Sequence, residues 1–349
     1  MIMKTFSNLF LLLTLVFIAS QLDASAILIS KNSDVGKAIC VSTHNFVDSV
    51  ADTIKKAKPA SKTSSKSASK KSTKPTVTEE DTTKYKGVPI IKPNPLSMPN
   101  PYRTAELIAG IKLAEGGDLK GALEKFDICL KKNPKNYQAS FYKAKALIEL
   151  GDKAGGFENI SIAIANSSNQ PLFYYYRGKL YYDAGNMDSA YKDFDKSITL
   201  NPRFADAVNY RGVIKELRGE HDQALVDFSL AVEINPSYAL AFYNKGTAEA
   251  SLKKYADAEQ SFTKAIELDE KNMQAYLNRG NTRVMLEKLD EAITDYSIVL
   301  NANYNMADAF FNRGVALHLK GGQNPCSDWS QAQKLGHKNA EEMILQHCK

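Results

Sequence analysis

"PLFYYYRGKLYYDAGNMDSAYKDFDKSITLNPRF", residues 171–204, is one of several stretches in this 349-residue chain that repeat with a period of 34 residues. A first row of small residues comprises Gly110, Ala144, Gly178, Gly212, Gly246, Gly280 and Gly314. A second row, twelve residues later, comprises Ala122, Gly156, Ala190, Ala224, Ala258 and Ala292. A third row, four residues further on, comprises Phe126, Ile160, Phe194, Phe228, Phe262 and Tyr296. A fixed period of this length indicates a repeat architecture.

Each unit predicts two antiparallel helices. Glycines at the middle of several units (Gly151, Gly185, Gly219) mark a turn between two amphipathic stretches, and prolines close several units. The pattern of a small residue, an alanine, an aromatic residue and a proline at these positions resembles the tetratricopeptide repeat. The resemblance covers residues 103 to about 336. It implies an all-α fold, a superhelical solenoid of about seven helix-turn-helix repeats whose first helices line a concave groove.

The end of the repeat array departs from this pattern. The seventh unit loses one residue in its turn, "LKGGQNPCSDW", which brings Trp329 to the aromatic position. Residues 337–349 predict a C-terminal capping helix, as terminal repeats need a cover for their apolar face. This C-terminal pattern resembles secreted tetratricopeptide proteins of Bacteroidetes-type bacteria.

Two cysteines lie in the last helix pair. Cys326 begins one helix and Cys348 ends the next, so the two thiols should lie level with each other. A disulfide is expected in an oxidising compartment, and two reduced thiols in an apolar cap are the alternative. Cys129 is expected in the core. A zinc site with His347 is disfavoured, because adjacent residues on a helix point in different directions, and no metal site is predicted.

The N-terminal third has a different composition. Residues 1–26 have the pattern of a signal peptide, with an uncleaved signal anchor as the alternative. Residues 27–54 form a short segment with room for one helix, and residues 55–101 a disordered linker rich in Lys, Ser, Thr and Pro. These features predict an extracytoplasmic protein, periplasmic or secreted.

The charge of the chain is unevenly placed. The net charge is +6, but residues 55–74 carry eight lysines and no acid, so the remainder sums to −2 (37 basic against 39 acidic residues). A folded part without a basic surplus argues against a nucleic-acid partner. The lysine-rich segment is interpreted either as a solvated spacer or as a tether to an anionic envelope surface.

A row of cations precedes the small residues of the first row, at Arg177, Arg211, Lys245, Arg279 and Arg313. Acids follow at Asp193, Asp227 and Asp295, sixteen residues after their arginines, and Asp328 follows Arg313 across the deletion. Since the turn lies midway, each arginine and its aspartate should lie level on antiparallel helices. Where the cation is lysine, Ser261 replaces the acid. We therefore expect structural pairs within repeats, and an anion-binding strip is the alternative.

Aromatic and amide side chains occupy positions that the resemblance assigns to the groove. The peptide-groove candidates are Tyr142, Tyr175, Tyr176, Tyr182, Tyr210, Tyr243, Asn244, Asn278 and Asn312. Asparagines can hydrogen-bond the backbone of an extended peptide, and tyrosines offer apolar contact with a polar tip. The alternative is that some of them pack between repeats.

No catalytic motif is present in the sequence: there is no phosphate loop, no HExxH and no serine elbow. The sequence therefore predicts a scaffold or adaptor, not an enzyme, that needs no cofactor and binds a protein or extended peptide in its groove. The alternative is a protein that binds a cell-envelope polymer, glycan or anionic wall material, through the aromatic groove and the lysine-rich segment.

Overall fold

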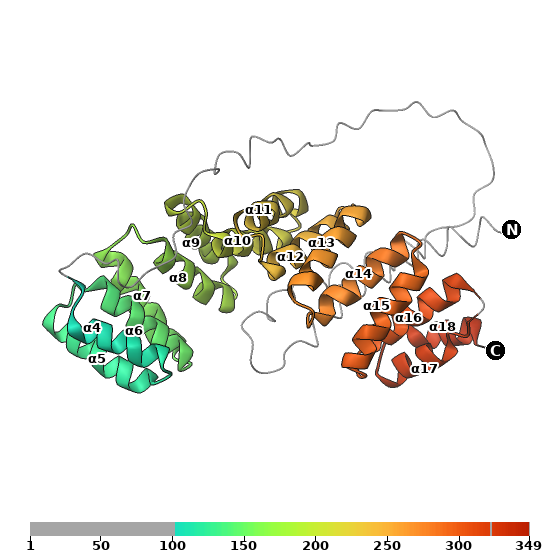
Figure 1. Cartoon of the computed structure of the whole chain (residues 1–349), viewed down its shortest axis with the longest axis horizontal. Helices are drawn as coiled ribbons and strands as arrows, with labels where there is room; N and C mark the ends of the chain where they lie inside the picture. Colours follow the sequence, from blue (N-terminus) through green and yellow to red (C-terminus); the bar gives the residue numbers. More distant parts are fainter. Residues whose placement is uncertain (1–101, 322, 349) are drawn as a thin grey trace, which may run out of the picture. The chain divides into compact units, whose positions relative to one another are not determined.

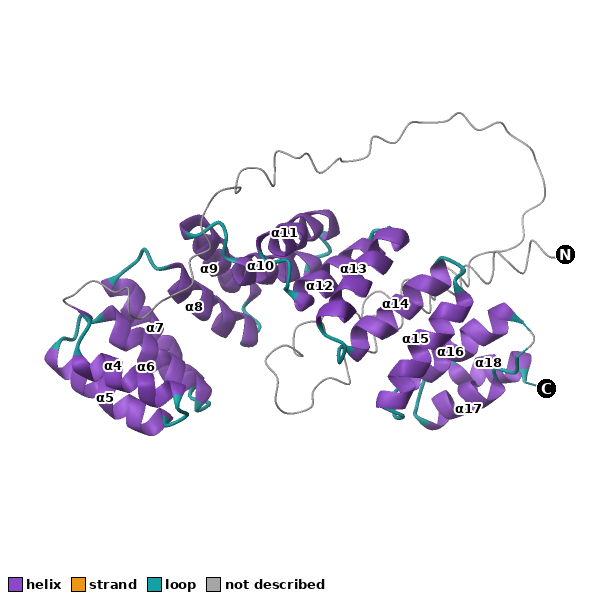
Figure 2. Cartoon of the chain, in the orientation of Figure 1, coloured by secondary structure: helices purple, strands orange, loops and turns teal. Residues whose placement is uncertain are grey.

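The computed structural model of the protein describes residues 102–321 and 323–348, and this part of the chain is helical without any strand (Figures 1 and 2). The predicted signal peptide, the short N-terminal segment and the lysine-rich linker lie outside the described residues. The predicted all-α fold of seven helix pairs followed by one more helix is confirmed.

The helices follow the repeat period. The first helices of the repeats are α4 (Ala105–Glu115), α6 (Tyr137–Glu149), α8 (Pro171–Asp183), α10 (Ala205–Leu217), α12 (Ala239–Ser251), α14 (Met273–Met285) and α16 (Ala307–Lys320). The second helices are α5 (Leu119–Lys132), α7 (Lys153–Asn166), α9 (Met187–Leu200), α11 (His221–Ile234), α13 (Tyr255–Leu268), α15 (Leu289–Ala302) and α17 (Cys326–Lys334). The chain ends with α18 (Ala340–His347).

The described residues divide into two compact units. The first unit comprises residues 102–214 and 227–236, and the second comprises residues 215–226 and 237–348. Helices α10 and α11 therefore contribute residues to both. Each unit has apolar cores of its own, around Phe126 and Ile160 in the first unit and around Phe262 and Trp329 in the second.

The glycines of the first row allow the two helices of a repeat to approach each other closely. A Cβ atom added to Gly246 would lie 2.8 Å from the Phe262 ring, and one added to Gly314 would lie 2.6 Å from Nε1 of Trp329. Real Cβ atoms do not approach so closely, so the ring occupies the space that a side chain would need. Because Ile160 replaces the ring in repeat 2, that repeat accommodates Ala144 at the glycine position.

The turn inside each repeat places one residue in the left-handed region of backbone space. Gly151 and Gly185 have φ of 91° and 77° there. Lys253 and Glu287 hold the same position in repeats 5 and 6, with φ of 59° and 60°. A side chain in this conformation costs about 1–2 kcal/mol, because its Cβ crowds the backbone.

Replacing Lys253 with glycine is expected to raise the free energy of unfolding by about 0.5–1 kcal/mol, as the relief of strain exceeds the added entropy of the unfolded chain. Urea denaturation of the full chain measures the change. The reciprocal variant Gly185→Ala is the control and should lower the free energy of unfolding. A loss of stability in Lys253→Gly would contradict the strain.

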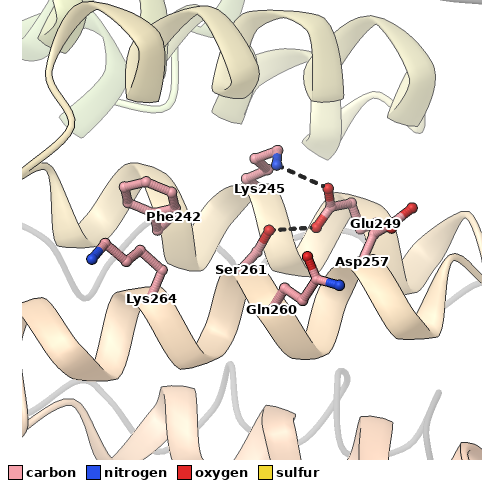
Figure 3. Close-up of a pocket in the computed structure, with 7 residues that line it drawn as sticks. All are labelled: Phe242, Lys245, Glu249, Asp257, Gln260, Ser261 and Lys264. Carbon is pink, nitrogen blue, oxygen red and sulfur yellow. Dashed lines mark hydrogen bonds and ion pairs between the residues drawn. The ribbon is translucent and has the colours of Figure 1, made fainter.

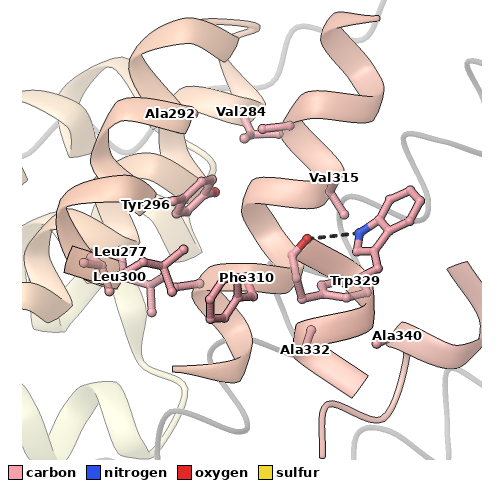
Figure 4. Close-up of a cluster of buried hydrophobic side chains, with 14 of the residues drawn as sticks. Leu277, Val284, Ala292, Tyr296, Leu300, Phe310, Val315, Trp329, Ala332 and Ala340 are labelled. Atoms are coloured by element: carbon pink, nitrogen blue, oxygen red, sulfur yellow. Dashed lines mark hydrogen bonds between the residues drawn. The ribbon is translucent and has the colours of Figure 1, made fainter. Parts of the chain in front are cut away.

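The last helix covers the end of the second unit (Figure 4). Ala340 and Met343 of α18 are buried against the cluster that contains Trp329, and Ile344 is partly buried there. The indole Nε1 of Trp329 donates a hydrogen bond to the backbone oxygen of Phe311 at 3.3 Å. The cap thus adds apolar cover where no further repeat follows, as repeat arrays require.

A disulfide joins the ends of this helix pair. Cys326 and Cys348 are bonded in the structure, with Cα atoms 5.7 Å apart and a sequence separation of 22 residues. Cys129 is a free thiol and is buried, as expected from its place in the second helix of repeat 1.

Removing this bridge with Cys326→Ser and Cys348→Ser is expected to lower the free energy of unfolding by about 3 kcal/mol, since the unfolded chain regains loop entropy. Denaturation with and without a reductant tests this. The reductant should destabilise the wild-type chain and leave the double variant unchanged. Equal stability of both chains under oxidising conditions would show that the bridge adds nothing.

Candidate functional site

The structure brings together all four Arg–Asp pairs expected within repeats. In each pair the guanidinium donates from Nε and Nη2 to the two carboxylate oxygens at 2.7–3.0 Å. The pairs are Arg177–Asp193, Arg211–Asp227, Arg279–Asp295 and Arg313–Asp328. The aspartates are largely buried, and each pair ties the first helix of a repeat to its second. This geometry favours a structural role over an anion-binding strip.

Three of these arginines also reach the preceding repeat, which sequence reasoning missed. Nη1 of Arg279 donates to Oγ1 of Thr263 at 3.2 Å. Equivalent bonds run from Arg211 to Asp195 at 2.7 Å and from Arg313 to Ser297 at 3.1 Å, and Lys143 pairs with Asp127 at 2.6 Å. The sequence feature that could have predicted these contacts is a row of polar residues spaced by 34, at Asp127, Ser161, Asp195, Ser229, Thr263 and Ser297. The cation row therefore links repeats as well as helices.

The nine predicted groove residues separate into two groups. Half-buried side chains belong to Tyr142, Tyr175, Tyr176 and Tyr210. Buried side chains, at most 8% exposed, belong to Tyr182, Tyr243, Asn244, Asn278 and Asn312. The amide-bearing end of the predicted groove is thus packed inside the second unit.

Two of the buried asparagines, Asn278 and Asn312, bond to the preceding repeat, which corrects their predicted role as ligand contacts. Nδ2 of Asn278 donates to the hydroxyl of Tyr243 at 3.1 Å. Nδ2 of Asn312 donates to Oδ1 of Asn281 at 2.9 Å. A buried amide needs such partners, because leaving it without a hydrogen bond is costly. These side chains join repeats to each other and do not present themselves to a ligand.

The half-buried tyrosines form a surface with two lysines. We call Tyr142, Lys145, Tyr175, Tyr176, Lys179 and Tyr210 the tyrosine–lysine strip; it lies on α6, α8 and the part of α10 in the first unit. Lys145 Nζ lies 5.7 Å from the ring centroids of both Tyr142 and Tyr176. Lys179 Nζ lies 6.0 Å from that of Tyr175 and 5.8 Å from that of Tyr210. Each ammonium group therefore bridges tyrosines of consecutive repeats.

Sequence reasoning selected the tyrosines of this strip but not its lysines. Lys145 and Lys179 are spaced by 34 residues, so their shared position in the repeat was the available signal. The rings contact one another: the centroids of Tyr175 and Tyr176 are 5.5 Å apart, and those of Tyr175 and Tyr210 are 5.9 Å apart. Because neighbours hold each ring, little side-chain entropy remains to be lost on binding.

Burial and nearby acids keep two tyrosines of the strip, Tyr142 and Tyr176, neutral. Burial first, and then the charge of Glu115 and the Tyr176 hydroxyl, raise the pKa of Tyr142 to about 12. Burial, followed by Asp206 and Glu149, raises the pKa of Tyr176. The hydroxyls therefore stay protonated at neutral pH and can both donate and accept hydrogen bonds.

A cavity of about 330 Å³ lies between α12 and α13 in repeat 5 (Figure 3). It is lined by Phe242, Lys245, Glu249, Asp257, Gln260, Ser261 and Lys264. Oε2 of Glu249 accepts a hydrogen bond from the Ser261 hydroxyl at 2.6 Å, and Nζ of Lys245 lies 3.2 Å from Oε1. This is the repeat in which lysine and serine replace arginine and aspartate.

In residues 102–321 and 323–348, no group of three or more His, Cys, Asp and Glu side chains is arranged to hold a metal ion. The same residues contain no helix with the length and apolar character that crossing a membrane requires.

One family model, described as "Tetratricopeptide repeat", matches residues 171–204 and 239–272. Another model with the same description matches residues 109–171. No curated protein matches the chain.

Three solved structures share the fold at 16–21% identity. PilF of Pseudomonas aeruginosa has 16% identity and a TM-score of 0.55, covering 60% of this chain and 96% of that one. The APC/C hetero-tetramer Cut9–Hcn1 has 19% identity and a TM-score of 0.52, covering 62% of this chain and 43% of that one. YrrB, described as a tetratricopeptide protein with an unusual peptide-binding site, has 21% identity and a TM-score of 0.50, covering 54% of this chain and 98% of that one.

Proposed function

We propose, from the tetratricopeptide repeats that this chain carries, that the protein is a non-catalytic scaffold that binds a protein or an extended peptide through the tyrosine–lysine strip. The observation that carries the proposal is the geometry of the strip. Three consecutive repeats present half-buried tyrosine rings, and lysine ammonium groups lie over those rings.

The chemistry of the strip suits a peptide ligand. Tyrosine is enriched among the residues that dominate binding energy, since it combines apolar area with a polar tip. The neutral hydroxyls can bond backbone carbonyl and amide groups, and Lys145 and Lys179 can meet acceptors on the ligand. A peptide-binding site in YrrB, a structure of the same fold, is consistent with this class of ligand.

The proposed place of action is the cell envelope or the outside of the cell. The signal-peptide pattern of residues 1–26 supports export, and the disulfide between Cys326 and Cys348 suits an oxidising compartment. The resemblance to secreted tetratricopeptide proteins of Bacteroidetes-type bacteria points to the same location. Residues 55–74, with their eight lysines, would place the repeats near an anionic envelope surface.

Panning a random peptide library against the chain from residue 27 onward tests the binding. Peptides that are enriched are then measured against Tyr142→Ala/Tyr176→Ala, for which we expect at least about ten-fold weaker binding, the loss typical of hot-spot residues. The matched control is Tyr304→Ala, a tyrosine that is 62% exposed and lies outside the strip. Helical content and melting temperature of each variant show that the fold is kept.

Two outcomes would overturn this function. Peptides that bind the strip variant and the control equally well would place their site elsewhere. Failure to enrich any peptide, together with binding of an envelope polysaccharide that Tyr142→Ala/Tyr176→Ala abolishes, would assign the strip to polymer binding instead.

A further inference from the structure

In three repeats the space between the two helices holds a guanidinium group against an aromatic ring. The guanidinium carbon lies 5.6 Å from the ring centroid of Tyr174 for Arg177, 5.4 Å from that of Tyr276 for Arg279, and 5.7 Å from that of Phe310 for Arg313. Each of these groups is also paired in a bidentate manner with the aspartate of its repeat. In each of these three repeats a ring and a carboxylate therefore hold the arginine side chain, and we call this arrangement the arginine seat.

Repeat 5 keeps a ring and a carboxylate but lacks the arginine. Phe242 stands at the position of Tyr174, Tyr276 and Phe310. Glu249, only 4% exposed, supplies the carboxylate, and it lies one helical turn after Lys245 on α12. Because lysine and serine are smaller than the arginine and aspartate of repeats 3, 4, 6 and 7, the cavity of about 330 Å³ remains between the helices.

One end of the cavity holds an aromatic ring and a lysine, and the other end holds two acids. Figure 3 shows Phe242 and Lys264 at one end and Glu249 and Asp257 at the other, with Ser261 between them. Ser261 and Glu249 are buried, whereas Asp257, Gln260 and Lys264 are exposed at the mouth. A long side chain with an apolar stem and a cationic head fits this arrangement, since the stem can lie along a ring while the head reaches the acids.

The resident lysine leaves much of the capacity of Glu249 for hydrogen bonds unused. Nζ of Lys245 lies 3.2 Å from one oxygen, and the Ser261 hydroxyl donates to the other. An ionised carboxylate offers about four lone-pair sites, and a guanidinium can meet both oxygens at once, which a single ammonium cannot. Lys264 is paired with Glu267 at 2.9 Å, and within the described residues Asp257 has no ion pair. The lining thus carries two acids and two lysines, and of the two acids Asp257 remains for an incoming cation.

We propose that the repeat-5 cavity binds the guanidinium group of an arginine supplied from outside the chain, with the stem along Phe242 and the head on Glu249 and Asp257. The arginine replaces Lys245 at Glu249, and Lys245 turns into solvent. This site is separate from the tyrosine–lysine strip and does not depend on the function proposed for it. The source is either free arginine or an arginine residue of a partner.

Calorimetric titration of the full chain with N-acetyl-arginine amide and with Gly-Arg-Gly tests the site, and N-acetyl-lysine amide is the matched control probe. The arginine probes should bind at least ten-fold more tightly than the lysine probe. Equal affinity of the two chemistries, or no binding of any probe, would overturn the proposal. Titration with free arginine separates the two sources. Tighter binding of Gly-Arg-Gly than of free arginine assigns the site to a partner's arginine, and equal or tighter binding of free arginine assigns it to the free amino acid.

Two variants locate the binding. Glu249→Gln should weaken binding of the arginine probes at least ten-fold, whereas Glu270→Gln, at an exposed acid that follows α13, should leave binding unchanged. The triple variant Lys245→Arg/Glu249→Leu/Ser261→Asp installs the side chains of repeat 7, at Arg313, Leu317 and Asp328, and so fills the seat from within the chain. This variant should keep its helical content and no longer bind the arginine probes. Undiminished binding to this variant would overturn the site even if Glu249→Gln failed to fold.

Discussion

Replacing Asp295 with alanine is expected to lower the free energy of unfolding by about 3–5 kcal/mol, the usual cost of removing one partner from a buried ion pair. The Asp295 side chain is 1% exposed and accepts from Nε and Nη2 of Arg279 at 3.0 and 2.8 Å. It also accepts from Nη1 of Arg283 at 2.7 Å. Alanine would leave two largely buried guanidinium groups without this acceptor. Urea denaturation of the full chain measures the loss.

Asp290→Ala is the matched control on the same helix. Its carboxylate is 75% exposed and pairs with Lys320 across the surface, so its loss should change stability by no more than about 0.5 kcal/mol. Leucine at both Arg279 and Asp295 should recover part of the loss, because burying no charge is less costly than burying an unpaired one. Equal losses in Asp295→Ala and Asp290→Ala would contradict the importance of the buried pair.

Replacing Trp329 with alanine is expected to lower the free energy of unfolding by about 3–5 kcal/mol, because a large core side chain leaves a cavity when it is removed. The indole is fully buried beside Gly314, between the last repeat and the cap. Its removal also takes the donor from the backbone oxygen of Phe311. Thermal unfolding, together with hydrogen exchange of the amides of α18, measures the loss, since the cap packs on this residue.

The variant Trp329→Phe keeps an aromatic ring at this position and removes the rest of the indole, so it tests how much of the loss comes from the ring. Phenylalanine holds this position in repeats 1, 3, 4 and 5, so it fits beside the glycine, and the expected loss is below about 2 kcal/mol. If phenylalanine and alanine destabilised the chain equally, the contact between ring and glycine would not account for the stability of the last repeat.

The Arg–Asp pairs could be predicted from the sequence because both partners belong to one repeat. The turn lies halfway between Arg177 and Asp193, so two antiparallel helices must bring them level whatever surrounds them. The same reasoning applied to Cys326 and Cys348 on either side of their turn, and the structure joins them. A contact within one helix pair is thus a property of spacing alone.

The groove residues could not be sorted in this way. Tyr175 and Tyr243 hold the same position in their repeats, yet the first is half-buried and the second is 8% exposed. The difference comes from neighbours: Asn278 in the following repeat donates to Tyr243, whereas Tyr210 in the corresponding place contacts the ring of Tyr175 edge to face. Position in the repeat therefore does not decide which side chain is available to a ligand.

By itself, the sequence determined the period, the helix pairs, the glycine row and the pairs within repeats, because these depend on residues joined by one short turn. The tertiary structure alone decided which tyrosines form a surface, how the arginines reach the preceding repeat, and that repeat 5 contains a cavity. Those features depend on distances between side chains of different helices and on the volume that they leave unfilled. Neither quantity is contained in the spacing of residues along a chain.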